Sequence, residues 1–154
     1  MKVASIECLF RSLNDASVPF VVVGGLAVVA HGYGRQTQDV DLVIRLRPDC
    51  IHAAFAALET LGCRPRVPVT AEMMSDPSVR ERLVRERGMM VLAFHSERHP
   101  ETPVDLVASE PFDFDAEHST DRPQDRVARN TPPFEPFRFV RSSSALRRCR
   151  KLPS

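Results

Sequence analysis

Few features in this sequence mark a secreted or membrane protein. Its four cysteines are scattered and show no Cys-x-x-Cys spacing, which argues against a disulfide scaffold and favours free thiols in a reducing compartment. No run of residues approaches the ~18 apolar positions of a membrane span, and a glutamate interrupts the apolar N-terminus. We therefore expect a cytoplasmic protein with no membrane partner.

Several common ligand-binding motifs are also missing. Gly32-x-Gly34 lacks the third glycine of a dinucleotide fingerprint, and no Gly-Lys-Ser or Gly-Lys-Thr string indicates a P-loop. His95 and His99 stand four residues apart in a polar segment, but no cysteine or third histidine completes a zinc site. We predict that both are surface histidines.

Length and charge predict one domain followed by a tail. The 154 residues suit a single compact domain, and the net charge of +1 conceals an asymmetry. Residues 1–118 hold 12 Lys+Arg against 17 Asp+Glu, whereas residues 119–154 hold 9 against 3, five of the 13 prolines and no glycine. We predict a folded domain over 1–118 and a basic, Pro/Arg-rich tail over 119–154, disordered or atypical. One hypothesis is that this tail binds nucleic acid.

Apolar periodicity predicts alternating helices and strands in the first part of the chain. A stripe with helical spacing, formed by Ile6, Leu9, Phe10 and Leu13, predicts an amphipathic helix. A continuous apolar run over 20–23 predicts a strand buried on both faces, a helix is expected over 26–31, and a second strand over 39–45.

Cap and turn signals define the remaining elements. Helices are predicted over 48–62 and 76–88, each beginning near a proline and ending at a glycine. The segment 64–69 is predicted as a proline-containing edge strand, and 89–94 with 104–108 as an antiparallel hairpin. A short strand over 137–141 is the one element expected in the tail.

Chemistry-bearing residues gather in positions 20–44. Gly24 and Gly25 separate the first strand from the following helix, where a chain without Cβ atoms lets a phosphate approach the backbone and the helix N-terminus. A tight strand-to-helix turn without any ligand explains the same pair of glycines. Both interpretations stay open on this feature alone.

The Asp39-Val40-Asp41 pair is the stronger signal. Two carboxylates two residues apart on a strand project from the same face, with Cα atoms about 6–7 Å apart. They repel each other unless a cation lies between them, and oxygen ligands of this kind suit Mg²⁺. A solvated strand end is the alternative.

Taken together, these motifs resemble the nucleotidyltransferase superfamily typified by DNA polymerase beta and the aminoglycoside nucleotidyltransferases. The matching string is Val23-Gly24-Gly25 followed by Asp39-Val40-Asp41-Leu42. The fuller string, which adds Leu26-Ala27, His31-Gly32, Arg35 and Thr37, is similar to small bacterial nucleotidyltransferases of the abortive-infection toxin type. The resemblance covers roughly residues 5–115 and implies an α/β (α+β) nucleotidyltransferase fold, a mixed β-sheet flanked by helices.

The resemblance also implies a set of catalytic residues. Asp39 and Asp41 would bind two Mg²⁺ ions together with a third carboxylate from a later strand. Asp105 is the preferred candidate for that carboxylate, because it lies in a predicted strand, and it could also act as the base. Asp113 and Asp115 form a second Asp-x-Asp pair, but capping is the expected role in their loop-like context.

Four further positions are assigned to the nucleotide by the same resemblance. Gly24 and Gly25 would cradle its phosphates. Arg35 would reach a phosphate or fix the loop, and Thr37 would bond either the backbone or the nucleotide. His31 would either help to position the nucleotide or pack at a helix end.

The expected activity is Mg²⁺-dependent transfer of a nucleoside monophosphate from an NTP to a hydroxyl of RNA, a protein or a small molecule. The resemblance implies a toxin–antitoxin or phage-defence setting with a cognate toxin or antitoxin as partner. The alternative is a catalytically weak or inactive module that binds a nucleotide or a partner protein.

Overall fold

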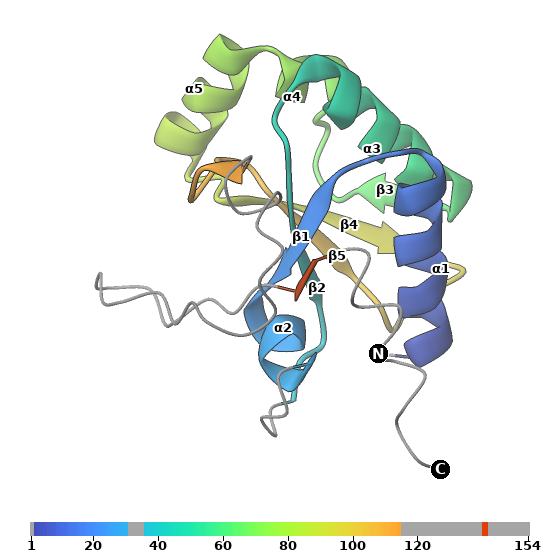
Figure 1. The fold of residues 1–154 in the computed structure, drawn as a ribbon. Coiled ribbons are helices and arrows are strands. Elements are labelled where there is room, and N and C mark those ends of the chain that lie inside the picture. The colour runs from blue at the N-terminus through green and yellow to red at the C-terminus, as the bar shows by residue number, and fades with distance from the viewer. Residues whose placement is uncertain (1, 31–35, 115–139, 142–154) are drawn as a thin grey trace.

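A mixed β-sheet forms the centre of the molecule, as seen in a computed structural model that describes residues 2–30, 36–114 and 140–141 (Figure 1). The strand order is β3-β4-β5-β2-β1-β6. This confirms the coarse prediction of a mixed sheet flanked by helices. Among the described residues, no helix combines the length and the apolar character needed to span a membrane.

Three strands in the middle of the sheet carry the segments on which the site is built. β1 (Phe20–Val23) is buried along its whole length and pairs antiparallel with β2 (Val40–Ile44). β2 in turn pairs in parallel with β5 (Val104–Val107). β1 matches the strand predicted over 20–23, and β2 is one residue shorter at each end than the strand predicted over 39–45.

The outer part of the sheet is antiparallel. β5 pairs with β4 (Val91–Ser96), and β4 with the short edge strand β3 (Cys63–Pro65). The edge strand predicted over 64–69 therefore begins one residue earlier and ends four residues earlier than expected. The prediction of a strand over 89–94 was shifted by two residues. The Met89 amide instead caps the preceding helix by donating to the carbonyl of Leu83, and the Met90 amide donates to the carbonyl of Gly88 in the turn that follows.

Helices α1 (Val3–Asp15), α3 (Pro48–Thr60), α4 (Ala71–Ser75) and α5 (Pro77–Arg87) follow one another in an arc around the sheet (Figure 1). The predicted stripe of α1 is buried, and α5 begins and ends at its predicted caps. Asp76 accepts hydrogen bonds from the amides of Ser78 and Val79, and Gly88 adopts a left-handed φ of 63°. The five-residue α4 was not predicted.

The main core lies between these helices and one face of the sheet. The rings of Phe10 and Phe20 pack at a tilt of 33° with their centroids 5.3 Å apart, and Phe55 meets Phe94 edge-on at the same separation. Each large side chain buried in this way contributes about 1.5–3 kcal/mol relative to exposure. The largest fully buried side chains are Phe20, Phe94, Leu13, Leu42, Ile44, Ile51, Leu58, Met74, Leu92 and Leu106.

The opposite face of the sheet has a smaller apolar cluster. Val21, Val23 and Val43 are buried there under Phe114, with Phe112 packed against them. The guanidinium carbon of Arg45 lies 5.7 Å from the centroid of the Phe114 ring. We call this second side of the sheet the open face, because the helices of the arc pack on the other side.

Parts of the remaining predictions fall outside the described residues. The two-residue strand β6 (Val140–Arg141) pairs antiparallel with β1 and lies within the strand predicted over 137–141. The other tail residues, together with His31, Arg35 and Asp115, are not among the described positions. Cys8 and Cys63 are free thiols, and Cys149 lies outside the described residues.

Candidate functional site

Two carboxylates are turned to the open face by the alternation of strands β2 and β5. Asp41 stands between the buried residues Val40 and Leu42, and Asp105 stands between the buried Val104 and Leu106. Successive side chains of a strand point to opposite faces. Burial of the apolar neighbours against the helices therefore directs both carboxylates away from the main core.

The register of the parallel pair brings these carboxylates side by side. Asp41 is the direct partner of Asp105 in the β2–β5 ladder, and neighbouring strands lie about 4.8 Å apart. Asp39 precedes β2 and is close enough to act on Asp105 electrostatically. Burial, followed by the negative charge of Asp39, raises the pKa of Asp105 above its ordinary value, while Arg66 opposes this shift. The three predicted acids thus share one region of the open face.

The Asp41 carboxylate occupies the space that Gly24 leaves by having no side chain. Gly24 has a φ of +66°, and a Cβ atom built on it would lie 2.0 Å from Oδ2 of Asp41. A Cβ on Gly25 would lie 2.6 Å from Oγ1 of Thr37. The space that each glycine leaves is therefore occupied by a side chain of the same protein, which gives the glycine pair a role in positioning Asp41 and Thr37.

The helix after β1 begins at the first of these glycines. α2 (Gly24–Ala30) starts two residues earlier than predicted, so that the glycine pair forms its first turn. Thr37 Oγ1 donates to the backbone oxygen of Asp39 at 3.2 Å. Of the two roles considered for Thr37, the structure therefore shows the bond to the backbone, and this bond fixes the chain just before Asp41.

Arg66 is a charged neighbour of the site that the sequence analysis did not identify. Its amide donates to the carbonyl of Ala93 at 2.8 Å, and Ala93 is the β4 partner of Asp105. One row across the sheet therefore runs from Arg66 through Ala93 and Asp105 to Asp41. The spacing Arg64-Pro-Arg66 in a predicted edge strand placed both arginines on one face, but only the register shows which face.

Asp113 differs from Asp105 in its setting. It is exposed and belongs to no strand, in the segment that carries Phe112 and Phe114 across the open face. Asp105, by contrast, is half-buried in β5 beside Asp41. The strand context on which Asp105 was preferred is thus observed.

The carboxylate oxygens of this site suit a hard cation that needs only a few protein ligands. Within residues 2–30 and 36–114, no three His, Cys, Asp or Glu side chains are arranged as a complete metal-binding group. Mg²⁺ takes only one or two protein carboxylates and completes its coordination with water and substrate phosphates. The oxygen-only pair Asp41 and Asp105, with Asp39 adjacent, fits that requirement.

The histidines turned out to have different roles. His95 is exposed on β4, which confirms its prediction as a surface histidine. His99 is half-buried and bonded to α1, so its prediction as a plain surface histidine was wrong. The Ser5 hydroxyl donates to Glu101 Oε1 at 2.8 Å and lies 2.9 Å from His99 Nδ1. Because the single hydroxyl proton goes to Glu101, Nδ1 of His99 is the donor to Ser5.

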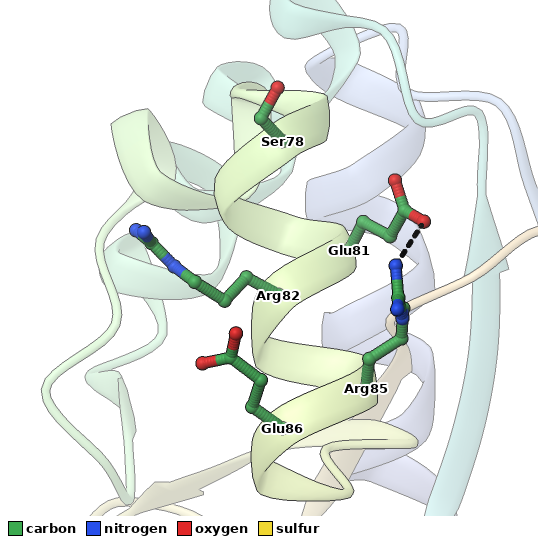
Figure 2. Close-up of a pocket in the computed structure, with 5 residues that line it drawn as sticks. All are labelled: Ser78, Glu81, Arg82, Arg85 and Glu86. Atoms are coloured by element: carbon green, nitrogen blue, oxygen red, sulfur yellow. Dashed lines mark hydrogen bonds and ion pairs between the residues drawn. The ribbon is translucent and has the colours of Figure 1, made fainter.

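Two shallow hollows lie along α5, and none of the three site carboxylates lines either of them. One, of about 440 Å³, lies between the start of α5 and the segments that follow β2 and β5. The other, of about 330 Å³, lies on the α5 surface shown in Figure 2, where Glu81 and Arg85 form an ion pair at 3.5 Å. Glu81 and Arg85 are four residues apart, so this ion pair lies along the solvent-exposed surface of the helix.

Comparison with family models, curated proteins and solved structures finds no match for this chain. The geometry of the open face is therefore the basis for the functional proposal.

Proposed function

We propose that the protein is an Mg²⁺-dependent nucleotidyltransferase with the nucleotidyltransferase fold, which transfers a nucleoside monophosphate from an NTP to a hydroxyl group. The observation that carries this proposal is the in-register pairing of Asp41 with Asp105 on one sheet face, with Asp39 beside them. The carboxylates come from separate strands, and their pairing in register supports a shared role in binding one metal site.

Each acid has a distinct role in this proposal. Asp39 and Asp41 would bind Mg²⁺ next to the NTP phosphates. Asp105 would help to bind Mg²⁺ next to the acceptor hydroxyl. When bound, Mg²⁺ supplies charge neutralisation for the phosphates and a lower pKa for the acceptor hydroxyl. Gly24 would keep Asp41 in place, since any side chain there would displace its carboxylate.

Asp105 is suited to receive the acceptor proton. In the reaction, the acceptor oxygen bonds to the α-phosphorus, the bond from that phosphorus to pyrophosphate breaks, and the hydroxyl proton moves to Asp105. A carboxyl group whose pKa is raised by burial and by Asp39 holds such a proton better than an ordinary aspartate. The same group must be ionised beforehand, which the nearby Arg66 favours.

The biological setting in this proposal comes from the sequence resemblance. The small nucleotidyltransferases that the motif resembles include abortive-infection-type toxins. We accordingly propose a toxin–antitoxin or phage-defence role, with a cognate partner protein, in the cytoplasm.

Transfer of a radiolabelled nucleotide tests the activity. Each of the four NTPs, labelled at the α-phosphate, is incubated with Mg²⁺, the protein, and total RNA or cell extract. We expect the wild type to produce labelled acceptor, and Asp41→Asn to reduce the rate by at least about 10²-fold, the lower end of the range for one essential catalytic group.

Asp15→Asn is the matched control for this experiment. Asp15 is exposed at the end of α1, so the same chemical change there should leave transfer unaltered. Equal labelling by wild type and Asp41→Asn would refute the mechanism. Calorimetric binding of NTP and Mg²⁺ without any turnover would instead support the non-catalytic nucleotide-binding module.

A further inference from the structure

A group of basic side chains lies on the open face next to the acidic site. Arg64 on β3 is the direct partner of His95 on β4, and Arg66 follows Arg64 by two residues. All three side chains are exposed. We call Arg64, Arg66 and His95 the edge strip, because they line the β3 edge of the sheet.

The register places the edge strip on the same face as the carboxylates. Residues paired directly across antiparallel strands share a face, and Ala93 and His95 are two residues apart on β4. Ala93 is partnered by Asp105, so the face that carries Asp105 also carries His95 and Arg64. Arg66 lies on this face as well, because it follows Arg64 by two residues and its amide continues the pairing to Ala93.

The arginines of the edge strip are available for a ligand. In the described part of the chain, neither Arg64 nor Arg66 forms an ion pair, whereas Arg47 and Arg85 are both bound to acids. In the register of the strands, Ala93 lies between Arg66 and Asp105. The distance across these strands is two spacings, about 9–10 Å between the Cα atoms of Arg66 and Asp105.

We propose that the edge strip binds the phosphate backbone of a single-stranded RNA acceptor and directs its terminal hydroxyl to Asp105. Arginine forks bind phosphate oxygens in pairs. Arg64 and Arg66 are separated by about 6.5–7 Å along the strand, which is similar to the spacing of successive phosphates in an extended nucleic-acid strand. The proposal rests on the proposed function, because it identifies the acceptor of that reaction.

An RNA strand fits this arrangement better than an acidic protein. In an RNA strand, the last phosphates lie at a short, fixed distance from the terminal hydroxyl. One ligand can therefore place phosphates on the edge strip and a hydroxyl at Asp105. In a protein, the anion and the hydroxyl belong to different side chains. Residues 1–118 are acidic as a whole, with 17 Asp+Glu against 12 Lys+Arg. A basic patch on such a domain, here the edge strip, would determine where a polyanion binds.

Fluorescence anisotropy with a labelled, short single-stranded RNA tests the proposal on the full chain. The double variant Arg64→Ala/Arg66→Ala is compared with Arg82→Ala/Arg87→Ala, which removes the same charge from exposed positions of α5. Loss of two phosphate contacts lowers the slope of log affinity against log salt by about 1.4. We expect this change, with about tenfold weaker binding, in the edge-strip variant only.

A charge-conserving variant excludes a folding artefact. Arg64→Lys/Arg66→Lys retains both charges and should recover most of the salt slope, while thermal melts confirm that every variant is folded. Equal weakening in the edge-strip and α5 variants would overturn the proposal, because net charge or the basic tail would then explain binding. Edge-strip-dependent binding of polyglutamate, with none of RNA, would also overturn it in favour of a protein acceptor.

The binding assay separates this proposal from the proposed function. RNA binding requires no turnover, so it is measured with Asp41→Asn as well as with the wild type. Absence of any nucleotide transfer, together with edge-strip-dependent RNA binding, would reject the enzyme and keep the RNA site. Transfer to a small molecule, with RNA binding unaffected by the edge-strip variants, would keep the enzyme and reject the RNA site.

Discussion

At the scale of single residues, two of the left-handed glycines, Gly24 and Gly88, are required for different reasons. Gly24 and Gly88 have nearly equal φ angles, of 66° and 63°. A Cβ on Gly24 would collide with Asp41, whereas one on Gly88 would meet nothing within 4 Å. Gly88 is thus required only by backbone conformation, and Gly24 by both conformation and contact.

This difference predicts a separable effect of alanine at the two positions. Gly88→Ala should lower the free energy of unfolding by about 1 kcal/mol, the cost of a left-handed alanine, and leave nucleotide transfer unchanged. Gly24→Ala should cost more and abolish transfer, because Asp41 must move. Denaturant unfolding and the labelled-nucleotide assay measure the two effects, and a fully active Gly24→Ala protein would contradict the assigned role.

Asp105 gives a prediction for pH. Its pKa is raised from the ordinary value of 3.8, so the folded state holds the proton more tightly than the unfolded state. Stability therefore decreases as the pH rises from 3.8 through the raised pKa of the folded state, and the penalty persists at neutral pH. In a chelating buffer at pH 7, Asp105→Asn should melt at a higher temperature than the wild type.

The pH dependence supplies the control for that measurement. Below pH 3.8 both states are protonated at Asp105, so the advantage of the variant should disappear. Asp15→Asn, at an exposed position, should show no such pattern. A lower melting temperature of Asp105→Asn at pH 7 would mean that the carboxylate is stabilising and that its assigned environment is wrong.

At the scale of elements, local sequence signals predicted most helices and strands. The caps Asp76 and Gly88 marked α5 because each satisfies backbone groups that a helix end leaves unpaired. The apolar residues around Asp105 predicted a strand over 104–108, and the structure has β5 there, over Val104–Val107. These signals depend on neighbours in sequence and can therefore be identified without knowledge of the fold.

Contacts between elements that are far apart in the sequence could not be predicted from it. Nothing in residues 63–66 indicates that Arg66 shares a row with Asp105, because two intervening strand registers decide it. His99 was predicted as a surface residue, since its partner Ser5 lies 94 positions away. The short α4 was missed because five residues are too few to establish a helical period.

The bonds between α1 and the β4–β5 loop predict the effect of one serine. Ser5→Ala removes the hydroxyl that joins His99 and Glu101, and should lower the free energy of unfolding by about 1–2 kcal/mol. Ser78→Ala, in the first turn of α5 and exposed, should change it by less than about 0.5 kcal/mol. Urea unfolding compares the two, and equal effects would show that the Ser5 bonds do not stabilise the fold.

At the scale of the whole molecule, the tail contributes a strand to the sheet. Val140 and Arg141 pair with Val22 and Val21 of β1, so that the outer side of β1 is covered at these positions. An uncovered strand edge offers amide and carbonyl groups to another chain. The tail is therefore more than a basic segment, because it also supplies strand β6 to the sheet.

Two truncations test this role of the tail. Deletion of residues 119–154 should destabilise the protein by about 1–2 kcal/mol and promote concentration-dependent self-association, because β1 loses its β6 bonds. Deletion of residues 142–154 alone retains β6 and should do neither. Thermal melts and light scattering report the two effects, and identical behaviour of both truncations would contradict the pairing.

The parallel register of β2 and β5 also has a consequence for the order of folding. Asp41 and Asp105 are separated by 64 residues, and the strands between them in the sequence lie at the outer edge of the sheet. Closing so long a loop is a late and slow step compared with formation of local helices. A chain emerging from the ribosome would therefore complete its acidic site only after β5 has been synthesised and docked, so the proposed activity would begin only when the domain is complete.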